Sequence, residues 1–116
     1  MKIAIVGTDP AGLYLACLLK RRAPASEVLI IDTGSPDRTG APPHILTNTV
    51  KPTLALEDGE VSDAIMAAAQ RTAGVRVVRD GETIRSPGHA YTLIGAVVLR
   101  DLLRRRAEAL GCKIET

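Results

Sequence analysis

The opening stretch MKIAIVGTDPAGLYLACLLKRR, residues 1–22, decides the fold of this chain. Residues 2–6 form a continuous apolar run that ends at Gly7, and this pattern indicates a strand buried on both faces. Residues 11–22 are apolar on most sides, which indicates a buried helix, and Pro24 cannot continue it. The chain therefore begins with a strand, a glycine-bearing turn and a helix.

A second strand follows this helix. Residues 27–31 (EVLII) repeat the buried-strand pattern, and Asp32 comes directly after them. A strand, a helix and a strand within about thirty residues form a βαβ unit, whose two strands run parallel. The sequence therefore predicts an α/β fold with a Rossmann-like parallel sheet.

The rest of the chain is assigned from turn residues and helical periodicity, and with 116 residues we expect a single domain. Asp80-Gly81 favours a tight hairpin, and Gly111 is expected to stop the last helix. The expected elements are a Gly- and Pro-rich loop at 33–43, a helix at 61–71, hairpin strands at 75–78 and 82–85, a helix at 95–110 and a strand at 112–115.

Composition argues against several classes of function. The net charge is only +2, and residues 20–22 and 104–106 are basic clusters near helix ends, where they complement the helix dipole, so we expect no nucleic-acid partner. No apolar stretch is long enough for a membrane span. Cys17 and Cys112 have no metal-ligand or redox spacing. We expect a cytoplasmic protein without a metal site.

The turn GTDPAG, residues 7–12, has the position of a dinucleotide-binding loop, which would read Gly-x-Gly-x-x-Gly. Gly7 and Gly12 match that pattern, but Asp9 replaces the middle glycine. At an effective dielectric of about 20, a carboxylate about 5 Å from a phosphate would weaken binding more than about a hundredfold. Asp9 followed by Pro10 is instead typical of a helix N-cap. The hypothesis is a dinucleotide loop filled by its own side chain.

Three stretches carry a family resemblance, which runs along essentially the whole chain. They are PAGLYLA at 10–16, VKPTLALEDGEV at 50–61 and TIRSPGHAYTLIG at 83–95. Together they resemble the N-terminal FAD-binding region of flavoprotein aromatic monooxygenases, in the branch that hydroxylates salicylyl-CoA and anthraniloyl-CoA. The resemblance implies an FAD-binding fold, of which these residues would form about the first third of such an enzyme and so remain incomplete.

Five positions match the cofactor contacts of that family. The resemblance implies that Gly7, Asp9, Ala11 and Gly12 lie where the loop cradles the FAD pyrophosphate, and that Asp32 matches the acid that holds the adenosine ribose. An alternative for Asp32 is a polar strand end. With Asp9 in place of glycine, this set is expected to be vestigial or weak.

Further positions depart from the family pattern. The family usually places a basic residue after the ribose acid, where this chain has Thr33. Pro42 and Pro43 lack N–H donors in a segment that runs past the cofactor in the family. An arginine directed at the cofactor phosphates is replaced by Ala96, and Arg100 lies one turn further on. These departures predict that FAD binding is weakened or lost.

No residue of the chain suggests a catalytic group. His44 and His89 have no partner at a spacing typical of a nucleophile or a metal site. Residues 86–89 (SPGH) resemble a family motif near the substrate, whose pocket needs sequence absent here. Glu57 and Asp58 lie in a Gly-flanked turn and are expected to be solvated.

Two functions remain open. The first is a non-catalytic interaction or assembly subunit of monooxygenase ancestry. The alternative is the FAD-binding part of an NAD(P)H-dependent aromatic acyl-CoA monooxygenase, completed by another chain or by further sequence. In a doubly wound sheet the first strand is paired on both sides, and here the later strand is missing. The edge of strand 2–6 is therefore expected to bind a protein partner or a second copy of the chain.

Overall fold

The computed structural model describes residues 1–34 and 40–116 of the protein. Its contacts divide the chain into two compact units, which we describe in turn. The first unit contains residues 1–42 and 96–116, and the second contains residues 43–95.

The first unit is a parallel sheet with two helices. Its elements are β1 (Lys2–Val6), α1 (Pro10–Arg22), β2 (Glu27–Ile31), α4 (Ala96–Ala109) and β8 (Lys113–Glu115). The strand order is β1-β2-β8, and both strand pairs are parallel. The prediction of an α/β fold with a parallel sheet is confirmed, and the predicted bounds of β1 and β2 agree with the structure.

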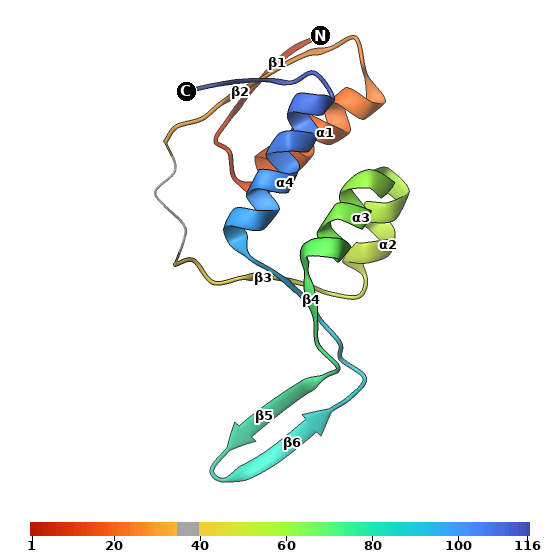
Figure 1. The fold of residues 1–116 in the computed structure, drawn as a ribbon, viewed down its shortest axis with the longest axis vertical. Helices are drawn as coiled ribbons and strands as arrows, with labels where there is room; N and C mark the ends of the chain where they lie inside the picture. Colours follow the sequence, from red (N-terminus) through yellow and green to blue (C-terminus); the bar gives the residue numbers. More distant parts are fainter. Residues whose placement is uncertain (35–39) are drawn as a thin grey trace. The chain divides into compact units, whose positions relative to one another are not determined.

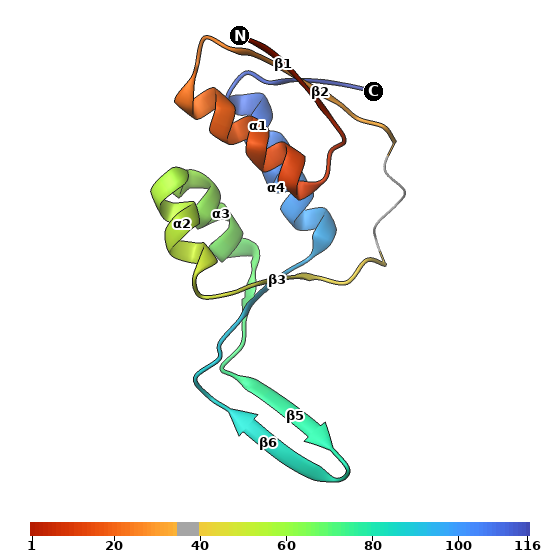
Figure 2. The ribbon, with the colours of Figure 1, turned by 180° about the vertical axis from the view of Figure 1, so that it is seen from behind.

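Helices α1 and α4 pack against each other on one face of this sheet. They lie side by side in both Figure 1 and Figure 2. Cys17 is fully buried between them, and its Sγ is 3.8 Å from the carbonyl oxygen of Leu103. The other buried residues of this seam include Leu13, Ala16, Leu99, Leu103 and Ala107. Apolar residues at helical spacing on α1 and α4 thus form the core of the first unit.

The opposite face of the sheet is open. Residues alternate along each strand, so Ile3, Ile5 and Ile30 lie on the helix face. Val28 and Ile114 share that face, and the other strand residues form what we call the open face: Lys2, Ala4, Val6, Glu27, Leu29, Ile31, Lys113 and Glu115. Val6 is 72% exposed. The prediction that the first strand is buried on both faces is therefore wrong.

Basic residues end both helices, but in different ways. Lys20, Arg21 and Arg22 occupy the last turn of α1 as predicted, and Lys20 Nζ donates to the carbonyl of Pro24 at 2.7 Å. In α4 only Arg106 lies in the last turn. Assigning the whole 104–106 cluster to the helix dipole is therefore wrong. Gly111, with φ of +87°, follows α4 as predicted.

The second unit contains two helices and two small antiparallel sheets. Strands β3 (His44–Leu46), β7 (Thr92–Ile94) and β4 (Gln70–Arg71) form one sheet, with β7 in the centre. Helix α2 (Val50–Glu57) was not predicted, and α3 (Gly59–Ala68) is shorter than the predicted helix at 61–71. That prediction is wrong at its end, because the chain becomes extended at Ala69 and enters β4.

Asp58, in the turn between α2 and α3, is buried rather than solvated. Asp58 is only 1% exposed, and its carboxylate accepts a hydrogen bond from the backbone of Val61 at 3.4 Å. It is the N-cap of α3, where it satisfies a backbone donor that the helix cannot satisfy itself. The prediction of a solvated Asp58 is therefore wrong.

The predicted hairpin is present. Strand β5 (Val75–Arg79) pairs antiparallel with β6 (Glu82–Ser86). Asp80 and Gly81 connect them with φ of +51° and +80°, the positive values that a two-residue type I′ turn requires. In the predicted 33–43 loop, residues 33–34 and 40–43 lie outside helices and strands, and residues 35–39 are outside the described residues.

Among the helices of the described ranges, none is both long enough and apolar enough to cross a membrane.

Candidate functional site

The site begins in the turn from β1 to α1. Gly7 ends the strand with φ of +103°, a left-handed value that favours glycine. Its N–H donates to the carbonyl of Ile31 at 2.8 Å, which ties the turn to β2. The turn therefore lies at the carboxyl end of the parallel strands, where open α/β sheets bind ligands.

Asp9 caps the helix that follows. Its backbone is extended, and its Oδ1 accepts a hydrogen bond from Gly12 N at 2.8 Å. Its backbone carbonyl accepts from Leu13 N at 3.1 Å, and Pro10 occupies the first helical position. The predicted N-cap is confirmed. A helix N-terminus offers free N–H groups to an anion, and here one of them is taken by an internal carboxylate.

Gly12 lies at a close approach between helix and strand. A Cβ added there would be 3.3 Å from both the carbonyl oxygen of Gly7 and Cγ2 of Ile5. Ala11, beside it in the first turn of α1, is exposed. Gly12 therefore has a packing role in the turn, whatever the turn binds.

Asp32 lies just after β2 and is fully engaged. Oδ1 accepts from Thr8 Oγ1 at 3.0 Å and from Gly34 N at 3.2 Å, and Oδ2 accepts from Arg104 at 3.0 Å. The hydrogen bonds from Arg104 and then Thr8 hold the pKa of the Asp32 carboxyl below its usual value, because they stabilise the charged form. Both carboxylate oxygens thus already have donors.

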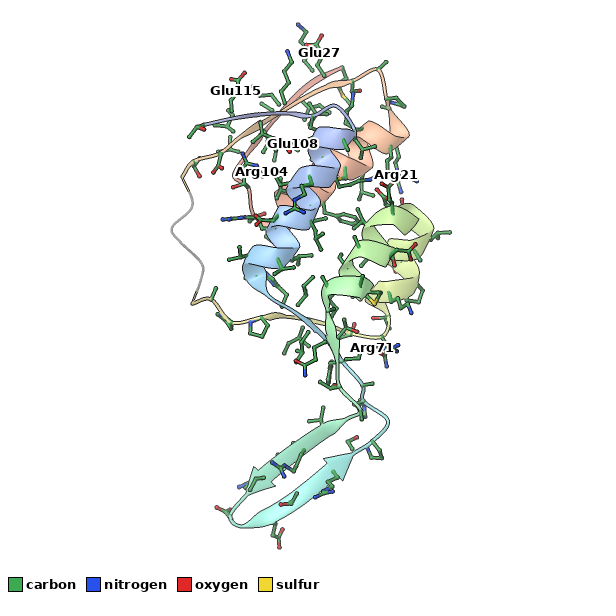
Figure 3. The ribbon with its side chains drawn as sticks, in the orientation of Figure 1. Arg21, Glu27, Arg71, Arg104, Glu108 and Glu115 are labelled. Carbon is green, nitrogen blue, oxygen red and sulfur yellow. The ribbon has the colours of Figure 1, made fainter. Side chains whose placement is uncertain are left out.

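Arg104 is one of two residues of this site that sequence reasoning missed. It reaches Asp32 from α4, and its Nε also lies 3.6 Å from Glu108 (Figure 3). Asp32 and Arg104 are 72 positions apart, so no local spacing pattern could have paired them. Thr8, only 3% exposed, was missed for a similar reason. Arg104 and Thr8 thus become donors to Asp32 through the packing of distant segments, and no sequence motif indicates them.

The departures from the family pattern lie outside this network. Thr33 is exposed beside Asp32. Ala96 is the first residue of α4 and is 7% exposed, so an apolar methyl group occupies the start of that helix. Pro42 and Pro43 precede β3. In the described ranges these positions provide no charged side chain to an anion.

The remaining candidates do not assemble into a catalytic site. Ser86 Oγ lies 2.6 Å from His89 Nδ1, an exposed contact that the sequence analysis did not foresee, and His44 is in β3. Cys17 and Cys112 are free and buried, and burial raises the pKa of the Cys112 thiol. No group of metal-binding side chains occurs among the described residues.

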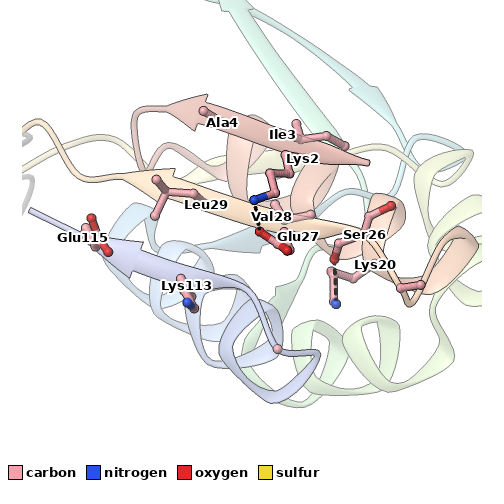
Figure 4. A pocket seen from close by; sticks show the side chains of 12 residues that line it. Lys2, Ile3, Ala4, Lys20, Ser26, Glu27, Val28, Leu29, Lys113 and Glu115 are labelled. Atoms are coloured by element: carbon pink, nitrogen blue, oxygen red, sulfur yellow. Dashed lines mark hydrogen bonds and ion pairs between the residues drawn. The ribbon is translucent and has the colours of Figure 1, made fainter.

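A hollow of about 530 Å³ lies away from the turn, over the open face. Its lining includes Lys2, Ala4, Glu27, Leu29, Lys113 and Glu115. Lys2 Nζ and Glu27 Oε2 are 3.4 Å apart across neighbouring strands (Figure 4). Neither Asp9 nor Asp32 lines this hollow, so it is separate from the predicted cofactor contacts.

Comparison with known proteins bears on the family. No protein-family model matches the chain. Salicyloyl-CoA 5-hydroxylase of a Streptomyces species is 29% identical over 114 residues, which are 98% of this chain and 22% of that protein. The resemblance to flavoprotein aromatic monooxygenases expected from the sequence is confirmed, and it lies in their N-terminal region.

Solved structures share the fold. The crystal structure of 2-methyl-3-hydroxypyridine-5-carboxylic acid oxygenase has a TM-score of 0.81 at 20% identity over 98% of this chain and 30% of that one. Anhydrotetracycline hydroxylase from Streptomyces rimosus has a TM-score of 0.72 at 22% identity over 99% and 24%. The chain therefore has the fold of one part of these enzymes and spans less than a third of their length.

Proposed function

We propose that this chain is a Rossmann-like, FAD-domain-like subunit that serves assembly rather than catalysis and binds FAD weakly or not at all. The observation that carries the proposal is the internal occupation of two matched cofactor contacts. Asp9 takes the Gly12 N–H at the position of the pyrophosphate, and Arg104, Thr8 and Gly34 take both oxygens of the acid that matches the ribose contact.

Competition at these contacts matters more than simple charge repulsion. Asp9 is exposed, so water screens its charge. At a dielectric of about 80, a phosphate about 5 Å away would bind about fourfold more weakly, compared with more than a hundredfold at a dielectric of about 20. Asp32 would have to exchange an ion pair with Arg104 for hydrogen bonds from a neutral diol. Such an exchange is unfavourable, because bonds between charged groups are the stronger ones.

The test is titration of the isolated chain with FAD, followed by flavin fluorescence. We expect no saturation at low micromolar FAD. Asp9→Gly should strengthen binding by at least about fourfold, and it should cost the helix little, because glycine is an acceptable N-cap. Asp9→Asn is the matched control, since it removes the charge but keeps a capping oxygen. Saturable binding by the parent chain at low micromolar FAD contradicts the proposal.

A second candidate is the FAD-binding part of an aromatic acyl-CoA monooxygenase, completed by other sequence. It is favoured by the likeness over 98% of this chain to 22% of a salicyloyl-CoA hydroxylase, and by the strand-turn-helix geometry at Gly7. Under this candidate, NAD(P)H would reduce the flavin before an aromatic acyl-CoA is hydroxylated. Purified protein that is yellow, with flavin absorbance, would favour this candidate over the first.

A further inference from the structure

The contact between Asp32 and Arg104 is the feature from which we draw a further inference. An acidic residue after the second strand of a Rossmann-like βαβ unit is the usual acceptor for a ribose hydroxyl. Asp32 has this position, directly after β2. The side chain of Asp32 is 20% exposed and that of Arg104 is 37% exposed, so neither is sealed in the core. Access of a ribose to Asp32 therefore depends on the donors that already surround its carboxylate.

The two carboxylate oxygens of Asp32 differ in the donors that they already have. Each carboxylate oxygen has about two acceptor sites. Oδ1 uses both, since it accepts from Thr8 Oγ1 at 3.0 Å and from Gly34 N at 3.2 Å. Oδ2 accepts from Arg104 Nη1 at 3.0 Å, and no second donor to it occurs in the described part of the chain. Oδ2 is therefore the oxygen that a ribose hydroxyl would use, and Arg104 already contacts it.

Of the three donors to Asp32, Arg104 is the one that a side-chain movement can remove. Thr8 is 3% exposed, and the Gly34 donor is a backbone N–H, so neither leaves the carboxylate unless the backbone moves. Arg104 is partly exposed, and its side chain has several rotatable bonds. Its backbone is held in place, because the preceding Leu103 is buried in the seam between α1 and α4. The guanidinium end is therefore the part that can leave Asp32.

We propose that Arg104 is a specificity-determining residue, which excludes a ribose hydroxyl from Asp32 by occupying Oδ2. A hydrogen bond between two charged groups is stronger than one from a neutral hydroxyl, so the ribose competes poorly with the guanidinium. The excluded ligand is the ribose of a nucleoside, and the competitor is part of the chain itself. This inference deepens the weak FAD binding proposed above and rests on it.

An arginine near this acid has another use in Rossmann-like folds, which is to accommodate the 2′-phosphate of NADP. The charges around Arg104 argue against that use here. Its Nη1 is 3.0 Å from Asp32 Oδ2, and its Nε is 3.6 Å from Glu108 Oε1, so two carboxylates share one guanidinium (Figure 3). A phosphate beside these three side chains would meet a net negative charge and be repelled. Arg104 thus blocks the acid and does not recruit a phosphate.

The first test separates the ribose contact from the pyrophosphate turn. Adenosine carries no phosphate, so its binding does not depend on the charge of Asp9. We expect Arg104→Gln to bind adenosine about five- to fifteenfold more tightly than the parent chain. This is the lower range for a hydrogen bond to a charged group, because Arg104 is partly exposed. The NMR shift of the Gly34 amide, which donates to Asp32, follows the titration.

An unchanged dissociation constant for adenosine, or no binding by Arg104→Gln, overturns the proposal. 2′-Deoxyadenosine is the matched ligand control, since it lacks the hydroxyl that such acids accept. The variant should gain little affinity for it. Equal gains for the two nucleosides would show a general opening of the surface and contradict the proposal.

Two further variants separate the position of the arginine from its charge. Arg105→Gln removes the same charge from the next position of α4, which is exposed, and should leave adenosine binding unchanged. Arg104→Lys keeps a cation near Asp32 and should gain less affinity than Arg104→Gln. A gain in Arg105→Gln, or equal gains in the two Arg104 variants, contradicts a block made by this contact.

The parent chain provides a test that needs no variant to fold. Because Arg104 occupies Oδ2, the parent should bind adenosine and 2′-deoxyadenosine with equal weakness, and a clear preference for adenosine overturns the proposal. These outcomes are distinct from those of the FAD titration. Saturable FAD binding by the parent overturns the proposed function, whereas a parent that binds no FAD and an Arg104→Gln chain that gains no adenosine binding overturn this inference alone.

Discussion

Asp32 shows how one side chain can join distant parts of the chain. Its carboxylate lies at the carboxyl end of β2, the edge of the sheet at which ligands bind in related folds. Arg104 and Thr8 nevertheless satisfy it from within the chain. The acid for which the resemblance predicts a ribose contact therefore joins α4 to the end of β2.

This ion pair predicts an acid-sensitive contribution to stability. The pKa of Asp32 is lowered in the folded chain, so its contribution is fully present above the unfolded value of about 4 and is lost as the pH falls through the folded pKa. We expect the difference in unfolding free energy between the parent and Asp32→Asn to be constant at neutral pH and to shrink below about pH 4. Urea titrations at several pH values measure it.

Arg104→Gln is the companion variant, because it removes the largest cause of the lowered pKa and keeps a long polar side chain. Its difference from the parent should shrink over the same acid range. A difference that stays constant down to about pH 2.5 would contradict the assignment of the pair.

At this scale, local contacts could be predicted and distant ones could not. The Asp9 cap depends on residues three positions apart, and Asp-Pro before an apolar helix is enough to indicate it. Asp58 caps α3 in the same way, but a neighbouring glycine and glutamate suggested a solvated turn. The pairing of Asp32 with Arg104 requires α4 to pack beside the first βαβ unit, which no residue pattern encodes directly.

At the scale of elements, the long periodic segments could be predicted from sequence. β1, α1, β2 and α4 were expected within one residue of their bounds, because each has a clear apolar pattern and a turn residue at its end. β3, β4 and β7 are two or three residues long, too short for periodicity to show. The covering of the sheet on one face only was also missed, since continuous apolar runs suggest burial on both.

The seam between α1 and α4 predicts a large effect of one core substitution. Leu103 is 3% exposed and packs in the seam, so Leu103→Ala leaves a cavity and should cost about 2–5 kcal/mol of unfolding free energy. Val98→Ala is the control in the same helix, because Val98 is 44% exposed and its truncation should change stability by less than about 0.5 kcal/mol. Urea denaturation compares them, and similar losses for both would argue against this seam as the core.

At the scale of the whole molecule, the likeness to aromatic monooxygenases covers only part of those enzymes. The chain has the fold of one part of flavin-dependent aromatic hydroxylases, and it spans 22% of the curated relative and 30% of a solved oxygenase. The resemblance could be predicted from the sequence because the three stretches that carry it, at 10–16, 50–61 and 83–95, all lie within the given chain. The single-domain organisation stays a prediction, since contacts divide the chain into two units.

The last prediction concerns catalysis by the isolated chain. The resemblance implies that hydroxylation needs a flavin that NAD(P)H can reduce. In this chain Asp9 accepts a hydrogen bond from Gly12 N, and Asp32 pairs with Arg104, so we propose that neither acid is available to a cofactor. The exposed contact between Ser86 and His89 offers no redox chemistry in its place. We therefore expect that an aromatic acyl-CoA, added with FAD, does not accelerate NAD(P)H oxidation above the rate of free FAD. Oxidation that rises with acyl-CoA concentration and disappears on heating the protein would show that the cofactor contacts are functional after all.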